Sequence, residues 1–217
     1  MKKETVILLL VTAVFCACGS QNSQNVQMLP ILGARKPIEK NVNGKTIVDT
    51  IYKKIPPFRL VNQDGSVVSN YDFDGKIYVA DFFFTSCPDI CPVIQRNMLK
   101  LYQKYRNNRQ VRLLSYTIDP DHDTSSKLKW YAKKLGVEDS QWEFLRGSKQ
   151  VIFSLAKNDY MVSIDDDTKG PGGFAHEGYL VLVDKEKRMR GVYDGTNEQE
   201  INKLMKDMDI LLAEHAK

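Results

Sequence analysis

Two cysteines carry the clearest chemistry in this sequence. Cys87 and Cys91 are separated by three residues, and each is followed by a proline. They follow a nearly continuous apolar run, Ile77 to Phe84, which predicts a buried strand, and they precede apolar residues at helical spacing. Both thiols are therefore expected at the carboxyl end of a sheet, where α/β proteins place their sites. Such a pair could form a disulfide, exchange electrons with other thiols or bind a soft metal ion.

The position of the pair at a strand–helix junction bears on its reactivity. Because a helix N-terminus stabilises negative charge, we expect a lowered thiol pKa there. A structural disulfide in an oxidising compartment is the alternative, although a loop this small at such a junction rarely holds one. A thioredoxin-type redox motif normally has two intervening residues, and the three found here suit a metal ion as well as a disulfide.

A metal site needs further ligands, and the chain has three histidines. His215 lies two residues from the C-terminus and His122 lies in a carboxylate-rich polar turn, so both are weak candidates. His176 follows the glycine-rich stretch 170–173 and precedes an expected strand, as a movable arm would. Cu(I) accepts three thiolate and imidazole ligands, whereas Zn(II) takes four. The residues alone favour a metal or redox site at the cysteine pair, with His176 as the best third ligand.

The elements that must position these residues follow an α/β pattern. Strands are predicted at 77–84, 111–118, 178–183 and 188–193, and helices over about 94–105, at 125–135, after Ser148 and over about 201–212. Thr196 and Gln199 are spaced as a capping box for the last helix. The last two strands are too close for a crossover helix. This order predicts a thioredoxin-like fold, in which a central mixed sheet is flanked by helices.

The residues before the core predict two hairpins. Asn43-Gly44, between strand-like runs at 37–42 and 45–52, is the strongest short hairpin signal, and Asp64-Gly65 predicts a smaller hairpin. Three segments are therefore expected. They are a signal peptide at 1–17, a lipidated N-terminus with linker and hairpin extension at 18–54, and the thioredoxin-like domain at 55–217.

The start of the chain indicates export. A basic head precedes the apolar run Val6–Phe15, which is typical of a signal peptide and shorter than the roughly 20 residues of a membrane-spanning helix. The following residues, 15–20, resemble a bacterial lipoprotein processing site. Cys18 is then expected to be lipidated and Cys16 removed, with an ordinary secretory signal as the alternative. The folded part is expected outside the cytoplasm, on the periplasmic side, anchored to the membrane by lipid.

Composition excludes several classes of function. The net charge of +4 over 217 residues comes without an Arg/Lys stripe interleaved with aromatic residues, so no nucleic-acid partner is expected. Four cysteines are too few for a disulfide scaffold, and export processing would leave only one pair. The acidic run Asp165–Asp167 lacks the spacing of a calcium loop. Asp119 and Asp123 are expected to cap turns or helix starts.

Four stretches together resemble a known family. They are Pro57-Phe58-Arg59-Leu60 with Asp64-Gly65, Phe82-Phe83-Phe84-Thr85-Ser86-Cys87-Pro88-Asp89-Ile90-Cys91-Pro92, Ile118-Asp119-Pro120-Asp121-His122-Asp123-Thr124, and Trp142-Glu143-Phe144-Leu145-Arg146-Gly147. From about Ile55 to the last helix, the chain resembles the Sco/SenC copper-binding assembly proteins of cytochrome c oxidase. The resemblance implies that Cys87, Cys91 and His176 bind copper, as Cu(I), Cu(II) or both.

Two hypotheses of function follow. The first is a membrane-tethered copper chaperone that delivers copper to the dinuclear copper site of cytochrome c oxidase, or to another copper protein. The second is an extracytoplasmic thiol–disulfide oxidoreductase, which reduces target cysteines or defends against oxidants and would make the protein an enzyme. A copper sensor or store without a delivery partner is a third interpretation. Only copper binding requires His176, so the variant His176→Ala separates the first hypothesis from the second.

Overall fold

The computed structural model describes residues 28–167 and 171–214. Its strands are β1 (Arg35–Val42), β2 (Lys45–Tyr52), β3 (Arg59–Val61), β4 (Val67–Ser69), β5 (Ile77–Phe83), β6 (Val111–Thr117), β7 (Trp142–Leu145), β8 (Ile164–Asp166), β9 (Phe174–His176), β10 (Tyr179–Val183) and β11 (Met189–Asp194). Its helices are α1 (Cys91–Tyr105), α2 (Ser125–Leu135), α3 (Lys149–Ser154) and α4 (Glu198–Glu214), with short turns η1 (Asn70–Phe73), η2 (Leu155–Tyr160) and η3 (Pro171–Gly173). Cys16, Cys18 and the predicted signal peptide lie outside the described residues, as does His215.

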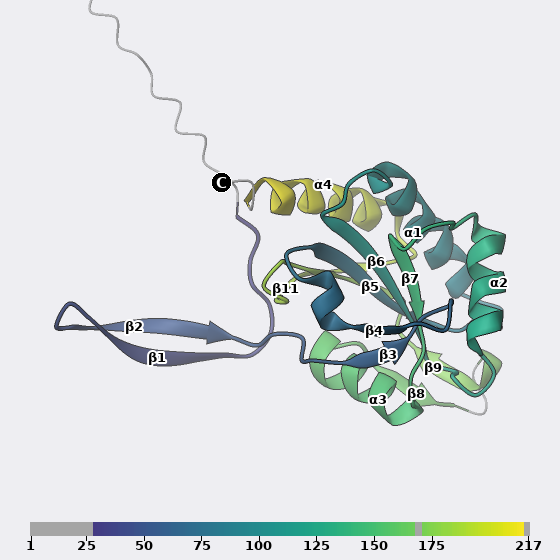
Figure 1. The fold of residues 1–217 in the computed structure, drawn as a ribbon, viewed down its shortest axis with the longest axis horizontal. Helices are drawn as coiled ribbons and strands as arrows, with labels where there is room; N and C mark the ends of the chain where they lie inside the picture. The colour runs from purple at the N-terminus through teal and green to yellow at the C-terminus, as the bar shows by residue number, and fades with distance from the viewer. Residues whose placement is uncertain (1–27, 168–170, 215–217) are drawn as a thin grey trace, which may run out of the picture.

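A five-stranded sheet with the order β11-β10-β5-β6-β7 forms the centre of the molecule (Figure 1). The strands β5, β6 and β7 are parallel, while β10 runs antiparallel to β5 and β11. All seven residues of β5 are buried, as its apolar sequence predicts for a strand covered on both faces. The predicted thioredoxin-like α/β fold, a mixed sheet flanked by helices, is confirmed.

Three helices cover one face of the sheet. The ring of Tyr102 on α1 packs against Trp142 of β7 at 6.0 Å between centroids, and Tyr131 of α2 lies 5.5 Å from Phe83 of β5. Helix α4 packs on β11 and β5. Helix α1, which begins at Cys91, is therefore held by packing along the sheet and does not depend on its own propensity alone.

Aromatic residues fill the other face, under α3, η2 and the β3–β4 hairpin. The hydroxyl oxygen of Tyr160 lies 3.1 Å from that of Tyr78 and 2.9 Å from that of Tyr116. The ring of Phe58, beside β3, packs edge-on against Tyr116 at 6.0 Å. The sheet that leads to the cysteines is thus packed on both of its faces.

The β1–β2 hairpin projects from the body of the protein, at the left of Figure 1. Its strands pair in register from Arg35 opposite Tyr52 to Val42 opposite Lys45, and β1 begins two residues before the predicted start. Asn43 and Gly44 have φ of 53° and 77°, as the tight turn of a hairpin requires. Within the described residues, no helix combines the length and apolar character needed to cross a membrane.

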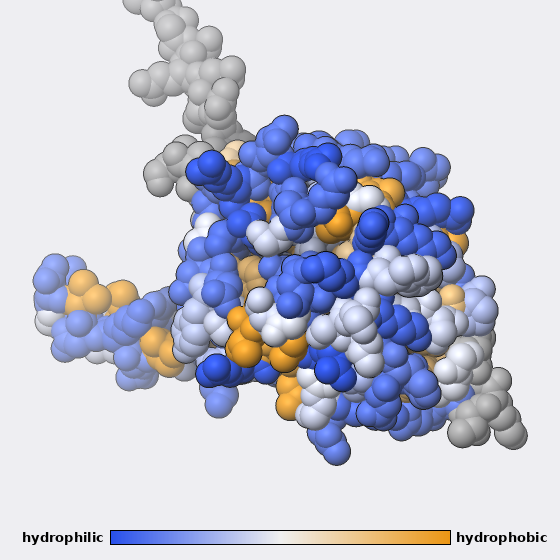
Figure 2. Space-filling model, turned by 45° about the vertical axis from the view of Figure 1, so that its right-hand side comes forward, coloured by the Kyte–Doolittle hydropathy of each residue, from blue (hydrophilic) through white to orange (hydrophobic). Residues whose placement is uncertain are grey.

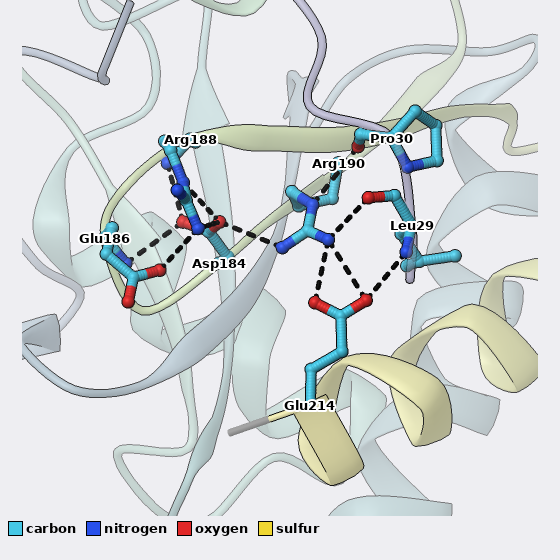
Figure 3. Close-up of polar contacts among 7 residues, drawn as sticks. All are labelled: Leu29, Pro30, Asp184, Glu186, Arg188, Arg190 and Glu214. Atoms are coloured by element: carbon cyan, nitrogen blue, oxygen red, sulfur yellow. Dashed lines mark hydrogen bonds and ion pairs between the residues drawn. The ribbon is translucent and has the colours of Figure 1, made fainter. Parts of the chain in front are cut away.

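A cluster of three buried charges fastens the segment before the hairpin to the body (Figure 3). The guanidinium of Arg190 donates to the carbonyl oxygens of Leu29 at 2.6 Å and Pro30 at 3.1 Å. It also pairs with Glu214 at 2.8 Å and Asp184 at 3.1 Å, and the amide of Leu29 donates to Glu214 at 2.7 Å. The N-terminal segment, the β10–β11 turn and the end of α4 therefore meet in one cluster.

The predicted capping box of the last helix is wrong. Helix α4 begins at Glu198, and the side-chain oxygen of Asn197 accepts from the amides of Gln199 at 2.9 Å and Glu200 at 3.3 Å. The Thr196 hydroxyl instead donates to Asp194 at 2.6 Å. Asn is as good a cap as Thr, so spacing alone could not separate two candidates one residue apart.

Candidate metal centre

The two cysteines lie where β5 passes into α1, as their sequence context predicts. Strand β5 ends at Phe83 and α1 begins at Cys91, with Pro92 as its second residue. The amide of Cys87 donates to the carbonyl oxygen of Phe84 at 3.3 Å, which curls the turn back on itself. Both cysteines are buried, at 8% and 1% exposure, and no disulfide joins them. The turn therefore forms a sheltered dithiol at the carboxyl end of the central strand.

The expected lowering of the thiol pKa is not found at Cys91, where the pKa is raised. The largest cause is the hydrogen bond between the side chains of Cys91 and Cys87, and burial adds to it. The negative charge of Asp81 also disfavours a second thiolate. Cys91 therefore holds its proton more firmly than an ordinary thiol, and metal binding would have to release that proton.

Asp81, in the middle of β5, is 1% exposed and is fixed by polar neighbours. It accepts a hydrogen bond from the amide group of Gln95 at 2.6 Å and another from the hydroxyl of Ser115. The indole of Trp142 donates to that same hydroxyl at 2.9 Å. In the sequence, Asp81 is visible only as the single charge of an apolar run. Its partners lie on other elements, so the run itself could not identify this network.

Asp123 fixes the turn before Cys87 through hydrogen bonds to Thr85. Its side chain is fully buried and accepts from the Thr85 amide at 3.0 Å, the Thr117 hydroxyl at 2.7 Å and the Thr85 hydroxyl. Asp123 was expected to cap a turn or a helix start. It caps the turn after β5 through the Thr85 amide and does not cap α2. The cap of α2 is Thr124, which accepts from the Lys127 amide at 3.3 Å. Asp123 instead links the loop after β6 to the turn after β5 that leads to Cys87.

His122 faces solvent, as its polar surroundings predict. Its side chain is 76% exposed, and its Nδ1 lies 2.8 Å from a carboxylate oxygen of Asp119, so the Asp119 side chain serves this contact and caps no helix. That hydrogen bond raises the pKa of His122. Within the described side chains, Cys87 and Cys91 gather no third His, Cys, Asp or Glu into a metal-sized group.

The backbone of His176 lies in a hairpin that the sequence did not reveal. Strand β9 ends at His176, whose backbone pairs with Ile164 of β8, whereas His176 was expected at the start of a strand. Its side chain lies outside the described part of the structure. The amide of Ser163 donates to the carboxylate of Glu177 at 3.0 Å, which fastens the base of this hairpin.

The tip of the β8–β9 hairpin packs on the strand that leads to the cysteines. The ring of Phe174 lies 5.1 Å from the ring of Phe84, three residues before Cys87. Gly172 has φ of 73°, and a Cβ there would lie 2.5 Å from the Phe84 ring. Only glycine therefore permits this close approach of the hairpin backbone.

The chain just after His176 packs on the helix that carries Cys91. A Cβ at Gly178 would lie 2.9 Å from Cδ1 of Ile94 and 3.3 Å from Cδ1 of Ile90. His176 therefore lies between two contacts in the sequence. Gly172 contacts Phe84, which precedes the cysteine turn, and Gly178 contacts Ile94, which follows it. These contacts hold the two ends of the segment that contains His176, and its role as third ligand stays a prediction.

Comparison with known proteins gives a consistent picture. The SCO1/SenC family model matches residues 50–211. A SCO1/SenC family lipoprotein from Bacillus anthracis is 29% identical, with a TM-score of 0.68 over 73% of this chain and 95% of that chain. BsSco, described as a Sco-family cytochrome c oxidase assembly protein with a disulfide switch, is 29% identical, with a TM-score of 0.64 over 73% and 92%.

A copper-bound structure shares the fold. Arabidopsis thaliana ScoI with copper bound is 24% identical, with a TM-score of 0.62 over 75% of this chain and 99% of that chain. The family match spans the cysteine turn, the loop after β6 and the β8–β9 hairpin. On this match, which covers most of the described residues, the chain belongs to the SCO1/SenC family.

Proposed function

We propose that this protein is a membrane-tethered copper chaperone that delivers copper to the dinuclear copper site of cytochrome c oxidase. The observation that carries the proposal is the sheltered dithiol, with the segment of His176 flanked by contacts of Gly172 with Phe84 and of Gly178 with Ile94. Copper is the metal that the relatives support for this chain, and ScoI from Arabidopsis thaliana carries it. The link of BsSco to oxidase assembly supports the target.

The residues have distinct roles in this proposal. Cys87 and Cys91 supply two soft sulfur ligands, and His176 supplies an imidazole; such ligands suit copper. Copper is cargo here, so the site must release it as well as hold it. A third ligand on a separate hairpin permits stepwise exchange, because His176 can leave or return without disturbing the turn that holds the cysteines.

The anchor belongs to the same proposal. Residues 1–17 are removed as a signal peptide, Cys18 is acylated, and the domain from 55 onward works outside the cytoplasm. The lipoprotein from Bacillus anthracis supports this arrangement. A tether would keep the chaperone beside a membrane-bound oxidase and raise the effective concentration of each for the other.

Copper titration of the reduced protein tests the proposal. The chain is expected to bind one Cu(I) and to transfer it to an isolated oxidase copper domain. The double variant Cys87→Ser/Cys91→Ser should lose binding, and His176→Ala should bind more weakly and transfer poorly. The Tyr160→Phe variant removes a buried hydroxyl on the other face of the sheet and retains all three ligands, so it controls for a loss of stability. Undiminished Cu(I) affinity in the double cysteine variant would overturn the proposal.

Thiol–disulfide exchange is the second candidate. The hydrogen bond between the side chains of Cys87 and Cys91 places them where a disulfide can form, and BsSco has a disulfide switch. Forming the disulfide would release two protons and two electrons, which a target disulfide accepts as it becomes a dithiol. Reductase activity that survives in His176→Ala, together with intact copper binding, would favour this function over copper delivery.

A further inference from the structure

The β1–β2 hairpin is a sheet of two strands with no covering element among the described residues. Every residue of β1 and β2 is exposed or half-exposed, and a lone two-stranded hairpin is only marginally stable in water. The family model begins at residue 50, so most of this hairpin lies outside the matched region. The metal centre therefore does not explain why the chain has this hairpin. Contact with another surface would stabilise it.

The pairing register sorts the side chains of the hairpin onto two unlike faces. Residues directly opposite each other in an antiparallel pair share a face. One face, here called the basic face, carries Lys36, Ile38, Lys40, Val42, Lys45, Ile47, Asp49 and Ile51. Figure 2 shows the hairpin at the left, with orange apolar side chains among blue polar ones. Val42, Ile47 and Ile51 of this face are about half exposed, at 47%, 46% and 54%.

The charges of the hairpin are unbalanced. Between Arg35 and Lys54, six cationic side chains accompany two acidic ones. On the basic face, Lys40 pairs with Asp49, while Lys36 and Lys45 make no ion pair within the described chain. Apolar side chains interspersed with lysines match a lipid interface, where hydrocarbon meets anionic head groups.

The hairpin emerges from the end of the sheet opposite the cysteines. The amide of Ile55 donates to the carbonyl oxygen of Lys187 at 2.8 Å, in the turn between β10 and β11. Because Val183 at the end of β10 pairs with Tyr78 at the start of β5, this turn lies at the opposite end of β5 from Cys87. A surface that contacts the hairpin would therefore lie at the far end of the sheet from the metal centre.

The N-terminal tether keeps the hairpin near the membrane. Leu29 is the eleventh residue after Cys18, and it is fixed to Arg190 and Glu214 (Figure 3). A chain of that length spans at most about 40 Å, and the eight-residue strands extend about 27 Å. The hairpin could contact a protein partner, a second copy of this chain or the membrane. Only the bilayer that holds the lipid of Cys18 stays within its reach at all times.

We propose that the basic face of the β1–β2 hairpin rests on the anionic lipid surface of the membrane that anchors the chain. The inference rests on the lipid anchor of the proposed function and gives it an orientation. Lysines contact lipid phosphates, while Ile38, Val42, Ile47 and Ile51 enter the head-group region. The dithiol, at the opposite end of the sheet, then stays clear of the contact with lipid and open to a partner domain.

Amide hydrogen exchange of the acylated full chain in vesicles tests this orientation. The vesicles contain phosphatidylcholine alone or with phosphatidylglycerol. On the anionic vesicles, the amides of residues 35–52 should exchange at least about tenfold more slowly than on phosphatidylcholine alone. Adding 0.5 M salt, which shortens the Debye length to about 4 Å, should reverse this protection. The variant Lys36→Gln/Lys40→Gln/Lys45→Gln should lose the protection. The matched variant Lys100→Gln/Lys133→Gln/Lys206→Gln, with the same charge change on three helices, should keep it.

Three results would overturn the inference. Equal protection on both vesicles would exclude anionic lipid. Protection that grows with protein density on the membrane would indicate a second copy, and protection only after an oxidase copper domain is added would indicate a protein partner. Copper titration of the protein on the same vesicles separates the two proposals. If the protein bound no Cu(I), the chaperone function would be refuted, and the lipid protection of residues 35–52 would still support the membrane contact.

Discussion

Asp123 shows how a single residue outside the ligand set controls the geometry of the site. Its fully buried carboxylate accepts three hydrogen bonds and ties Thr85, two residues before Cys87, to Thr117 of β6. A carboxylate only accepts, so it matches three donors at once. Without it, the turn that leads to the dithiol loses its link to the neighbouring strand.

Replacing Asp123 by Asn should therefore weaken both stability and metal binding. The new amide group would face donors, so we expect urea denaturation to show a loss of about 1–3 kcal/mol in the free energy of unfolding. Cu(I) affinity, measured by competition with a chelator, should fall as the turn loosens. Asp121→Asn removes the same charge from an exposed position of the same loop and should change neither quantity. Equal effects of the two variants would contradict this role.

The residues of the site differ in how visible they are in the sequence. Cys87 and Cys91 are recognisable because their spacing and their place after an apolar run express their chemistry locally. Asp123 and Asp81 are not recognisable in that way, because their partners come from other strands and helices. The raised pKa of Cys91 also escaped prediction, since it depends on burial and on the contact with Cys87.

At the scale of elements, the approach of the β8–β9 hairpin to β5 depends on Gly172. Replacing Gly172 by Ala places a methyl group 2.5 Å from the ring of Phe84 and also strains a backbone with positive φ. Gly173→Ala is a matched control, because it has φ of 89° and open space around it. Both variants should lose about 1–2 kcal/mol of stability from backbone strain.

Only Gly172→Ala should also displace the hairpin that carries His176. On the proposed function, Cu(I) affinity should then fall further in Gly172→Ala than in Gly173→Ala, by about tenfold or more, as a weakened third ligand would produce. Chelator competition on the two purified variants measures the difference. Equal Cu(I) affinities would show that the Phe84 contact does not position the histidine.

Elements marked by a regular period or by a turn were predictable, and short elements without such a mark were not. The Asp64-Gly65 turn predicted the hairpin of β3 and β4, although each strand has only three residues. The bounds of β2 and α2 agree with the sequence pattern at both ends, because hairpin turns, caps and apolar spacing mark them locally. Strand β7 has four residues, all buried, and was missed because so short a run has no period to detect. Strands β8 and β9 have three residues each, and their pairing depends on packing against Phe84.

At the scale of the whole molecule, the fold separates attachment from chemistry. The dithiol lies at the carboxyl end of β5, while the N-terminal segment and the β1–β2 hairpin join at the other end, beside the β10–β11 turn. The sheet between them is rigid because both of its faces are packed with aromatic rings. An orientation imposed on the N-terminal segment, which Arg190 and Glu214 hold to the body, is therefore passed to the metal centre.

Arg190 is the residue on which this connection depends. It is 3% exposed and joins Leu29, Pro30, Glu214 and Asp184. Arg190→Ala leaves two buried carboxylates without their shared cation, which typically costs about 3–5 kcal/mol, and urea denaturation should show a loss of that size. Proteolysis should also cut the freed chain before β1. Arg188→Ala, which removes a more exposed partner of Asp184, should lose less and keep the segment protected; equal losses would place the connection elsewhere.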